Sequence, residues 1–232
     1  MFPMYYDPTF LLLIPAMILA IYAQLKVQST FRRYLQTPAR SNLSGAQVAR
    51  ALLDKNQLAD VPVEITPGNL TDHYDPRRRV LRLSPDVYHG RSLAALGVAA
   101  HETGHAVQHR HEYIPLNIRN SLYPAANFGS SLAFPIFFIG LIFGRGGSFL
   151  MDLGIVLFLV TVLFQVLTLP VEFNASKRAL VMLEEGGFLA RGGEVAGAKK
   201  VLSAAALTYL AATAMALLQL FRLLILRGSR DD

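Results

Sequence analysis

The chain has 232 residues, of which 53% are hydrophobic, and its mean hydropathy of +0.36 is higher than that of ordinary soluble domains. It contains no cysteine, which excludes disulfides, thiolate metal ligands and cysteine nucleophiles, so a metal site must use histidine and carboxylate ligands. The formal charge of +6 could suggest a nucleic-acid partner. The basic residues, however, lie between long apolar segments, and this arrangement favours a membrane and argues against nucleic acid.

Four segments are almost free of charged residues over about 20 residues, the length that crosses the hydrocarbon core of a bilayer. They lie between Asp7 and Lys26, between Arg119 and Arg145, from Phe149 to Val171 with only Asp152 charged, and between Lys200 and Arg222. We therefore predict a mainly α-helical, polytopic membrane protein with about four transmembrane helices.

The basic residues also predict an orientation. Lys26, Arg32 and Arg33 follow the first apolar segment, which indicates an anchor with its N-terminus outside rather than a cleaved signal peptide. With four crossings, eighteen of the 22 lysines and arginines then lie inside. Arg145 lies in the short outer loop between the second and third segments, and the three arginines of the tail are the exceptions to the charge rule. The expected location is the cytoplasmic (inner) membrane, with the polar block on the cytoplasmic side.

The polar block, residues 28–127, has the patterns of a small α+β lobe. Ser44 is a plausible N-cap for a helix over NLSGAQVARALLDKNQL, and Ser92 is one for the long helical stretch up to His111, which Pro115 should end or follow. The sequences VPVEIT and RRVLRLSP read as short strands, and PGNLTDHYDP between them reads as turns. The strand containing VLRLS could bind an extended substrate along its edge, or it could be an ordinary sheet strand.

The long helical stretch ends in GVAAHETGHAVQHRH, which contains the pattern H-E-x-x-H. Residues four apart share one face of a helix, so His101 and His105 can direct their imidazoles at one zinc ion. Catalytic zinc takes three protein ligands and keeps a fourth position for water, whose pKa the metal lowers to about 7. Glu102 lies beside that position, where it can act as a general base. A buried structural patch fits less well, because burying these groups without a partner is costly.

Three residues compete for the place of the third ligand. His109 continues the four-residue spacing, but three ligands along one straight helix cannot surround one ion. His111 has the spacing of the metzincin pattern, yet Gln108 occupies the position where that pattern needs a helix-breaking glycine. Glu172 ends the third apolar segment, two crossings after the histidines and on the same side of the membrane, and Pro170 suits the start of a new helix there.

Several long stretches resemble one known family: DPTFLLLIPAMILAIYAQ, LTDHYDP, VLRLSPDVYHGRS, GVAAHETGHAVQH, PLNIRN, TLPVEFNASKRAL and VLSAAALTYLAA. Together they are similar to the YugP-like membrane zinc metallopeptidases of bacteria, over nearly the whole chain. The resemblance implies a neutral zinc metallopeptidase of the gluzincin type, in which His101, His105 and Glu172 bind one Zn²⁺ and Glu102 is the catalytic carboxylate. EFNASKRA is also similar to the zinc-binding helix of membrane-embedded gluzincins, where an aspartate supports a zinc histidine. Ser176 stands at that aspartate's position.

With the resemblance, the chain is expected to divide into five segments. These are an N-terminal transmembrane anchor (1–27), an α+β lobe carrying H-E-x-x-H (28–127), a transmembrane hairpin (128–170), a helix with the third zinc ligand and a loop (171–200), and a C-terminal transmembrane helix with a tail (201–232).

The predicted function is that of a zinc metalloendopeptidase acting on membrane proteins or on peptides near the membrane surface. A zinc hydrolase of a non-peptide substrate and a non-enzymatic scaffold or adaptor with structural zinc stay open as alternatives. Expected partners are the lipid bilayer, a peptide or membrane-protein substrate, and further copies of the chain or other membrane proteins. Candidates for supporting the ligands or for donating to the oxyanion are Asn174, Ser176, Arg178, His73, Tyr74 and Tyr88.

Overall fold

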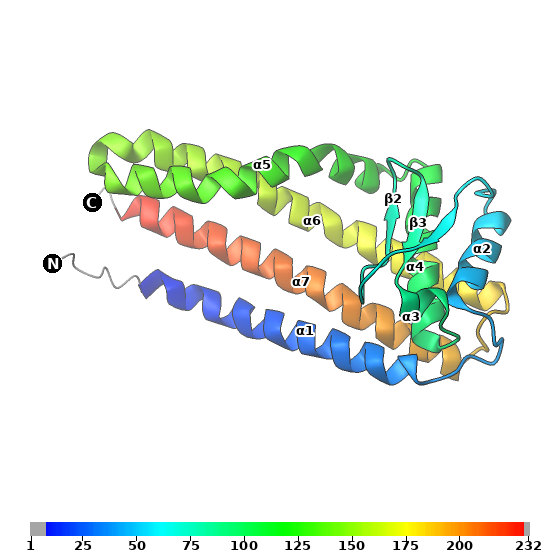
Figure 1. Ribbon diagram of the computed structural model, residues 1–232. Helices are drawn as coiled ribbons and strands as arrows, with labels where there is room; N and C mark the ends of the chain where they lie inside the picture. The colour runs from blue at the N-terminus through cyan, green and yellow to red at the C-terminus, as the bar shows by residue number, and fades with distance from the viewer. Residues whose placement is uncertain (1–7, 230–232) are drawn as a thin grey trace. The chain divides into compact units, whose positions relative to one another are not determined.

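The computed structural model describes residues 8–229, so the outer ends of the predicted first and last segments, 1–7 and 230–232, lie outside the described residues. The described chain is mainly helical and has a small three-stranded sheet (Figure 1). In chain order the elements are the 3-10 helix η1 (Pro8–Leu13), α1 (Ile14–Leu35), α2 (Gly45–Lys55), β1 (Val63–Ile65), β2 (His73–Asp75), β3 (Val80–Leu83), α3 (Pro85–Tyr88), α4 (Leu93–Arg110), α5 (Ile114–Ile142), the 3-10 helix η2 (Gly144–Gly147), α6 (Ser148–Glu185) and α7 (Gly193–Gly228).

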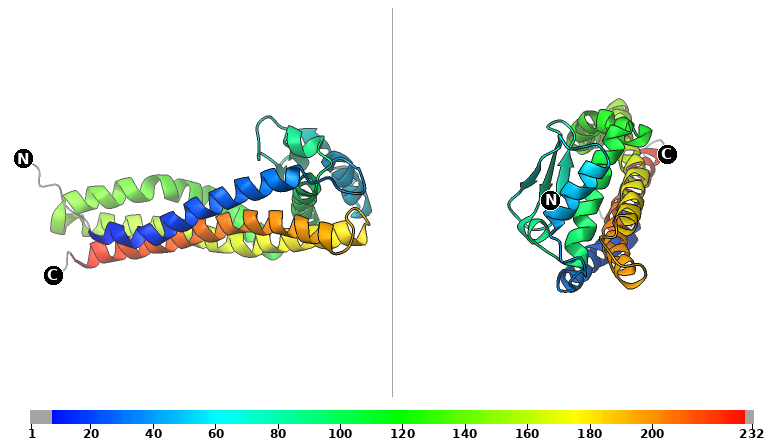
Figure 2. Two further views of the ribbon diagram at one scale, coloured as in Figure 1. Left: turned by 90° about the horizontal axis from the view of Figure 1, so that it is seen from below. Right: turned by 90° about the vertical axis from the view of Figure 1, so that its right-hand side faces the viewer.

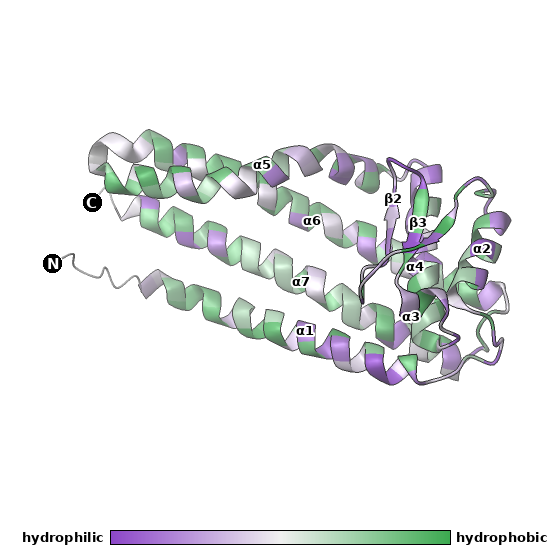
Figure 3. Ribbon diagram, viewed as in Figure 1, coloured by the Kyte–Doolittle hydropathy of each residue, from purple (hydrophilic) through white to green (hydrophobic). Residues whose placement is uncertain are grey.

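Four helices of the described chain are long and apolar enough to cross a membrane: Pro8–Leu35, Ile114–Ile142, Ser148–Glu185 and Gly193–Gly228. Apolar residues predominate along these four helices in Figure 3, whereas polar residues concentrate in the short elements and their loops. The predicted fold class is therefore confirmed. One local expectation is wrong: Pro170 begins no new helix, because α6 continues through it to Glu185.

The chain forms two compact units. The first contains the described parts of Met1–Tyr22 and Tyr209–Asp232 together with Ile118–Leu169, and the second contains Ala23–Asn117 and Pro170–Thr208. The five-segment division expected from the sequence stays a prediction.

Helices α5, α6 and α7 form an apolar core in the first unit. Phe137, Phe158 and Leu223 are among its buried side chains. Near the start of α6, the single acidic residue noticed in the third apolar segment has a partner. Asp152 accepts a hydrogen bond from Nε of Arg227 on α7 at 2.8 Å, so a charge that would be costly beside apolar helices is paired.

The second unit packs the small sheet against helices α2 and α4. The strand order is β1-β3-β2, with β1 parallel and β2 antiparallel to β3. Figure 2 shows the strands beside α4, and both β2 and β3 contact this helix. Because β3 is the central strand and largely buried, the idea that VLRLS offers its edge to a substrate is wrong; the free edges belong to β1 and β2.

The two predicted helix caps of this unit are confirmed. Ser44 and Gln47 form a capping box at the start of α2, with both reciprocal hydrogen bonds present. The Ser92 side chain accepts the backbone N–H of Ala95 at 3.2 Å, which fixes where α4 begins. Pro115 lies in the first turn of α5, where its missing N–H costs nothing.

Candidate metal centre

The centre of the candidate site is the middle of α4, where the two histidines of the H-E-x-x-H pattern point to one side of the helix. His101 and His105 have their ring centroids 4.7 Å apart and nearly perpendicular ring planes. The side chains of His101 and His105 are only 13% and 12% exposed, so both imidazoles are largely shielded from water. The helix that carries them is buried along most of its length, which holds the histidines in place.

Helix α6 crosses α4 at this point, and a glycine makes the close crossing possible. A methyl group built onto Gly104 would lie 2.8 Å from the carbonyl oxygen of Ala175, which is closer than side chains approach backbone atoms. The α6 backbone therefore packs directly on the α4 backbone between the two histidines. Glu172 lies one turn before Ala175 and is 3% exposed, so its carboxylate is buried at the crossing.

The three side chains converge on one point. Oε2 of Glu172 lies 3.3 Å from Nε2 of His101 and 3.5 Å from Nε2 of His105. The candidate ligand atoms of the three residues all lie within 4.8 Å of one another. Tetrahedral zinc with bonds of about 2.0–2.1 Å holds its ligand atoms about 3.3–3.4 Å apart. Two imidazole nitrogens and one carboxylate oxygen at these separations fit a zinc ion with one position left for water or substrate.

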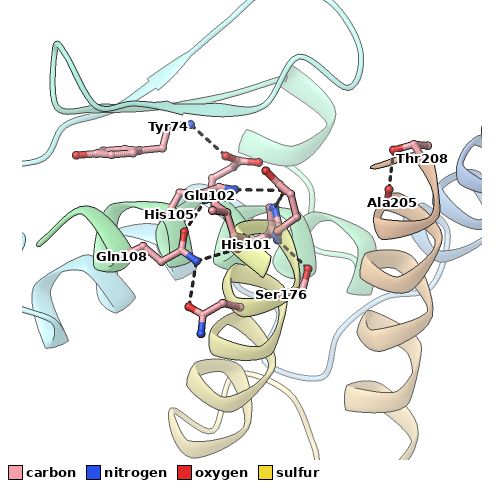
Figure 4. Close-up of polar contacts among 11 residues, drawn as sticks. Tyr74, His101, Glu102, His105, Gln108, Ser176, Ala205 and Thr208 are labelled. Atoms are coloured by element: carbon pink, nitrogen blue, oxygen red, sulfur yellow. Dashed lines mark hydrogen bonds and ion pairs between the residues drawn. The ribbon is translucent and has the colours of Figure 1, made fainter. Parts of the chain in front are cut away.

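Glu102 lies beside this group and is held by the backbone of the sheet. It is 8% exposed, and its Oε2 accepts the backbone N–H of Tyr74 at 3.0 Å (Figure 4). Tyr74 is the middle residue of the edge strand β2 and is paired in register with Leu81 of β3. The strand thus directs a main-chain donor at the carboxylate and fixes its orientation.

Each histidine has a polar partner at its other ring nitrogen. Nδ1 of His101 lies 3.1 Å from Oγ of Ser176, and Nδ1 of His105 lies 3.0 Å from Oε1 of Gln108 (Figure 4). These contacts leave Nε2 of both rings facing Glu172. Burial by itself lowers the pKa of His105, but the hydrogen bond and negative charge of Glu172 outweigh burial and raise this pKa above its ordinary value.

The other residues singled out from the sequence are distributed around the centre. Oδ1 of Asn174 accepts a hydrogen bond from Nε of Arg178 at 2.8 Å. The Tyr74 hydroxyl lies 2.9 Å from Nδ1 of His109, so this histidine faces a polar neighbour and stands outside the converging group. His111 is the C-terminal cap residue of α4 and also stands outside that group.

Two remaining candidates stay away from the contacts just described. His73 is exposed on β2, with Nδ1 placed 2.8 Å from the carbonyl oxygen of Thr71. The Tyr88 ring lies at the end of α3 and contacts His89.

Sequence reasoning missed two features of the site. The sequence predicts for Gln108 only that it continues the helix, whereas the residue is fully buried against His105 and α6. At strand β2 the sequence predicts a turn, because TDHYDP has the Asp and Pro of turns and the strand has only three residues. No local pattern marks the amide of Gln108 as buried, because this residue is followed directly by His109 and Arg110.

Long apolar helices and a buried H-E-x-x-H helix facing a glutamate are the features of a membrane protein with a metallopeptidase-like centre. Residues 9–228 match the family described as "Putative neutral zinc metallopeptidase", and the chain belongs to this family. It is 50% identical to "Putative membrane protease YugP" of Bacillus subtilis (strain 168) over 222 residues, which cover 95% of this chain and 97% of that protein. No solved structure matches the chain at a significant level. The family predicted from the motifs is thus confirmed.

Proposed function

We propose that the protein is a membrane-embedded, zinc-dependent metalloendopeptidase with one Zn²⁺ per chain. The observation that carries the proposal is the convergence of Nε2 of His101, Nε2 of His105 and Oε2 of Glu172, with the buried carboxylate of Glu102 beside them. The donor set and its spacing match the requirements of zinc, and the family gives the class of reaction.

Each residue then has a definite task. His101, His105 and Glu172 hold the metal, which when bound polarises the substrate carbonyl and acidifies its water. Glu102 accepts the proton of the attacking water and afterwards delivers it to the nitrogen of the leaving amine, so that the peptide bond breaks with one water consumed. The backbone N–H of Tyr74 holds the Glu102 carboxylate in position before the proton moves.

The surroundings of the site favour a substrate at the membrane. Glu172 belongs to α6, one of the four helices apolar enough to cross a bilayer, and it lies toward the end of that helix. We expect a site on such a helix to act on membrane proteins and on peptides near the bilayer surface. In this proposal the site lies on the cytoplasmic side of the cytoplasmic membrane, and the eighteen basic residues expected inside support that orientation.

The decisive experiment compares the wild-type protein with Glu102→Gln, both purified in detergent and reconstituted in vesicles. The substitution keeps the shape of the side chain and removes the base. We expect it to retain zinc and to lose about 10²–10⁴-fold in cleavage of a panel of soluble and membrane peptides. Equal cleavage by both proteins would refute the mechanism.

The same measurement separates the alternatives. Cleavage by neither protein, with zinc bound to both, would favour a scaffold with structural zinc. Hydrolysis by the wild type of an ester or amide outside the peptide panel would favour a zinc hydrolase of another substrate class. Zinc content of Glu172→Ala and His111→Ala then tests the third ligand, because only the first is expected to lose the metal.

A further inference from the structure

Gln108 is the one fully buried amide side chain among the described residues of α4, and all of its polar atoms have partners. Its Oε1 lies 3.0 Å from Nδ1 of His105. Its Nε2 donates to the backbone carbonyl of Val171 at 2.8 Å and to Oδ1 of Asn174 at 3.0 Å. The side chain therefore connects a candidate zinc ligand on α4 with the residue that precedes the other candidate ligand, Glu172, on α6.

The donor and the acceptor of each hydrogen bond in this network can be assigned by starting from Arg178, the residue at the end away from His105. The guanidinium of Arg178 can only donate, so the Asn174 atom that it contacts at 2.8 Å must be the amide oxygen. That oxygen accepts, and the group facing it from Gln108 must be the amide NH₂.

A second, independent contact gives the same orientation of the Gln108 amide. The Val171 carbonyl can only accept, and it lies 2.8 Å from the same Gln108 nitrogen. With both NH₂ hydrogens directed at acceptors, the carbonyl oxygen Oε1 must face His105. An oxygen acceptor at 3.0 Å requires that Nδ1 of the imidazole carry a hydrogen.

We propose that Gln108 is a positioning residue that selects the metal-binding form of His105. With Nδ1 as the N–H, the free lone pair of the ring lies on Nε2, the atom that faces Glu172 at 3.5 Å. Arg178 can only donate, and this fixes the orientation of the Asn174 amide. The Asn174 amide in turn fixes that of Gln108, and Gln108 requires the hydrogen of His105 to be on Nδ1. This inference rests on the zinc centre of the proposed function and adds a residue to which the sequence pattern assigns no role.

His101 has no comparable constraint. Its Nδ1 faces the Ser176 hydroxyl at 3.1 Å, and a hydroxyl donates or accepts equally well. The two candidate ligands therefore differ. The hydrogen bond from His105 to Gln108 fixes the tautomer of His105, whereas the Ser176 hydroxyl is compatible with either tautomer of His101.

The test measures the dissociation constant of zinc for full-length protein in detergent by competition with a chelator. Gln108→Met keeps the length of the side chain and removes all three polar contacts, and we expect zinc binding about 10–100-fold weaker. Thr103→Val is the matched control. Thr103 is equally buried on α4, and its hydroxyl bonds only to the carbonyl of Ala99 within the same helix. The control should bind zinc as the wild type does.

A second pair of variants separates polarity from packing. Asn174→Asp keeps an oxygen acceptor toward both Gln108 and Arg178, so zinc affinity should stay within about threefold of the wild type. Asn174→Leu has nearly the same shape and no acceptor, and it should lose about tenfold or more. Melting curves of the metal-free variants establish that each one is folded.

The outcomes are distinct. If wild-type protein binds zinc and Gln108→Met binds it as tightly as Thr103→Val, Gln108 has no positioning role, while the zinc centre stands. Equal affinities of Asn174→Asp and Asn174→Leu would show that the network acts through packing and would overturn the polarity inference. Failure of the wild type to bind zinc at all would overturn the proposed function, and the inference with it.

Discussion

Adding a single methyl group at Gly104 should weaken zinc binding without unfolding the protein. The new carbon would lie 2.8 Å from the carbonyl oxygen of Ala175, more than half an ångström inside ordinary van der Waals contact. Because the obstructing atom belongs to the backbone of α6, no side chain can turn away, and the two helices must separate. Glu172 moves with α6 and the histidines stay with α4, so the converging atoms are pulled apart.

The size of the effect follows from the tolerance of metal sites. Metal–ligand distances are held to about ±0.2 Å, which is less than the separation that Gly104→Ala requires. Inserting a methyl group into a packed contact costs about 1–3 kcal/mol. If zinc needs the original spacing, this cost appears in the binding free energy and corresponds to a loss of about 5- to 150-fold in affinity.

The chain supplies a matched control on the same helix. A methyl group on Gly97 would lie 3.6 Å from Cβ of Ala198, an ordinary contact, so Gly97→Ala should keep its zinc affinity. It should also melt slightly higher, since alanine is favoured over glycine in a helix by about 0.8–1.0 kcal/mol. The assay is chelator competition with melting curves for both variants. If Gly104→Ala binds zinc as tightly as Gly97→Ala, the close crossing does not set the ligand spacing and the reasoning is refuted.

Three further predictions concern the partner of His101, the stability that zinc adds, and a partly buried carboxyl group just before β2. Ser176→Ala should lower zinc affinity about tenfold, because it removes the partner of His101, and Ser176→Asp should raise the affinity. Both affinities are measured by chelator competition, and unchanged values in both variants would contradict the role of this contact. Free zinc at 100 times its dissociation constant should stabilise the wild type by about 2.7 kcal/mol, and chelation should reverse the shift in melting temperature, whereas Glu172→Ala should respond to neither treatment. Burial raises the pKa of Asp72 above its ordinary value of 3.8, even though Ser84 donates to it. The folded protein thus holds this proton more tightly than the unfolded chain, so the free energy of unfolding should fall as pH rises from 3.8 through the raised pKa. Asp72→Asn should flatten that part of the profile in melting curves; an unchanged slope would count against it.

The fold class and the central residues could be predicted because they depend on local patterns. Each apolar segment of membrane length, and the four-residue spacing of His101 and His105, can be recognised within one short, continuous part of the sequence. Glu172 could not be found from a local pattern, because it lies 71 and 67 positions after His101 and His105. Only the count of membrane crossings and the resemblance to a family connect it with the two histidines. The structure brings these three side chains together, as expected, while their roles as ligands stay with the proposal.

The parts that escaped sequence reasoning depend on contacts between distant segments. Gln108 reaches Asn174, 66 residues away, and no spacing rule along one helix reveals such a bond. Strand β2 was missed because its three residues carry turn-forming neighbours, and pairing with β3 overrides that preference. Pro170 was misread because proline usually ends a helix, yet α6 continues through this position.

The donor that holds Glu102 comes from the main chain of Tyr74, and this origin makes the arrangement resistant to sequence drift. Every amino acid except proline supplies the same N–H, so position 74 can change its side chain over generations while the carboxylate keeps its anchor. A side-chain donor would have confined that position to a few residue types. The orientation of the Glu102 carboxylate therefore depends on the path of strand β2, and the side chain at position 74 is left for other contacts, such as that with His109.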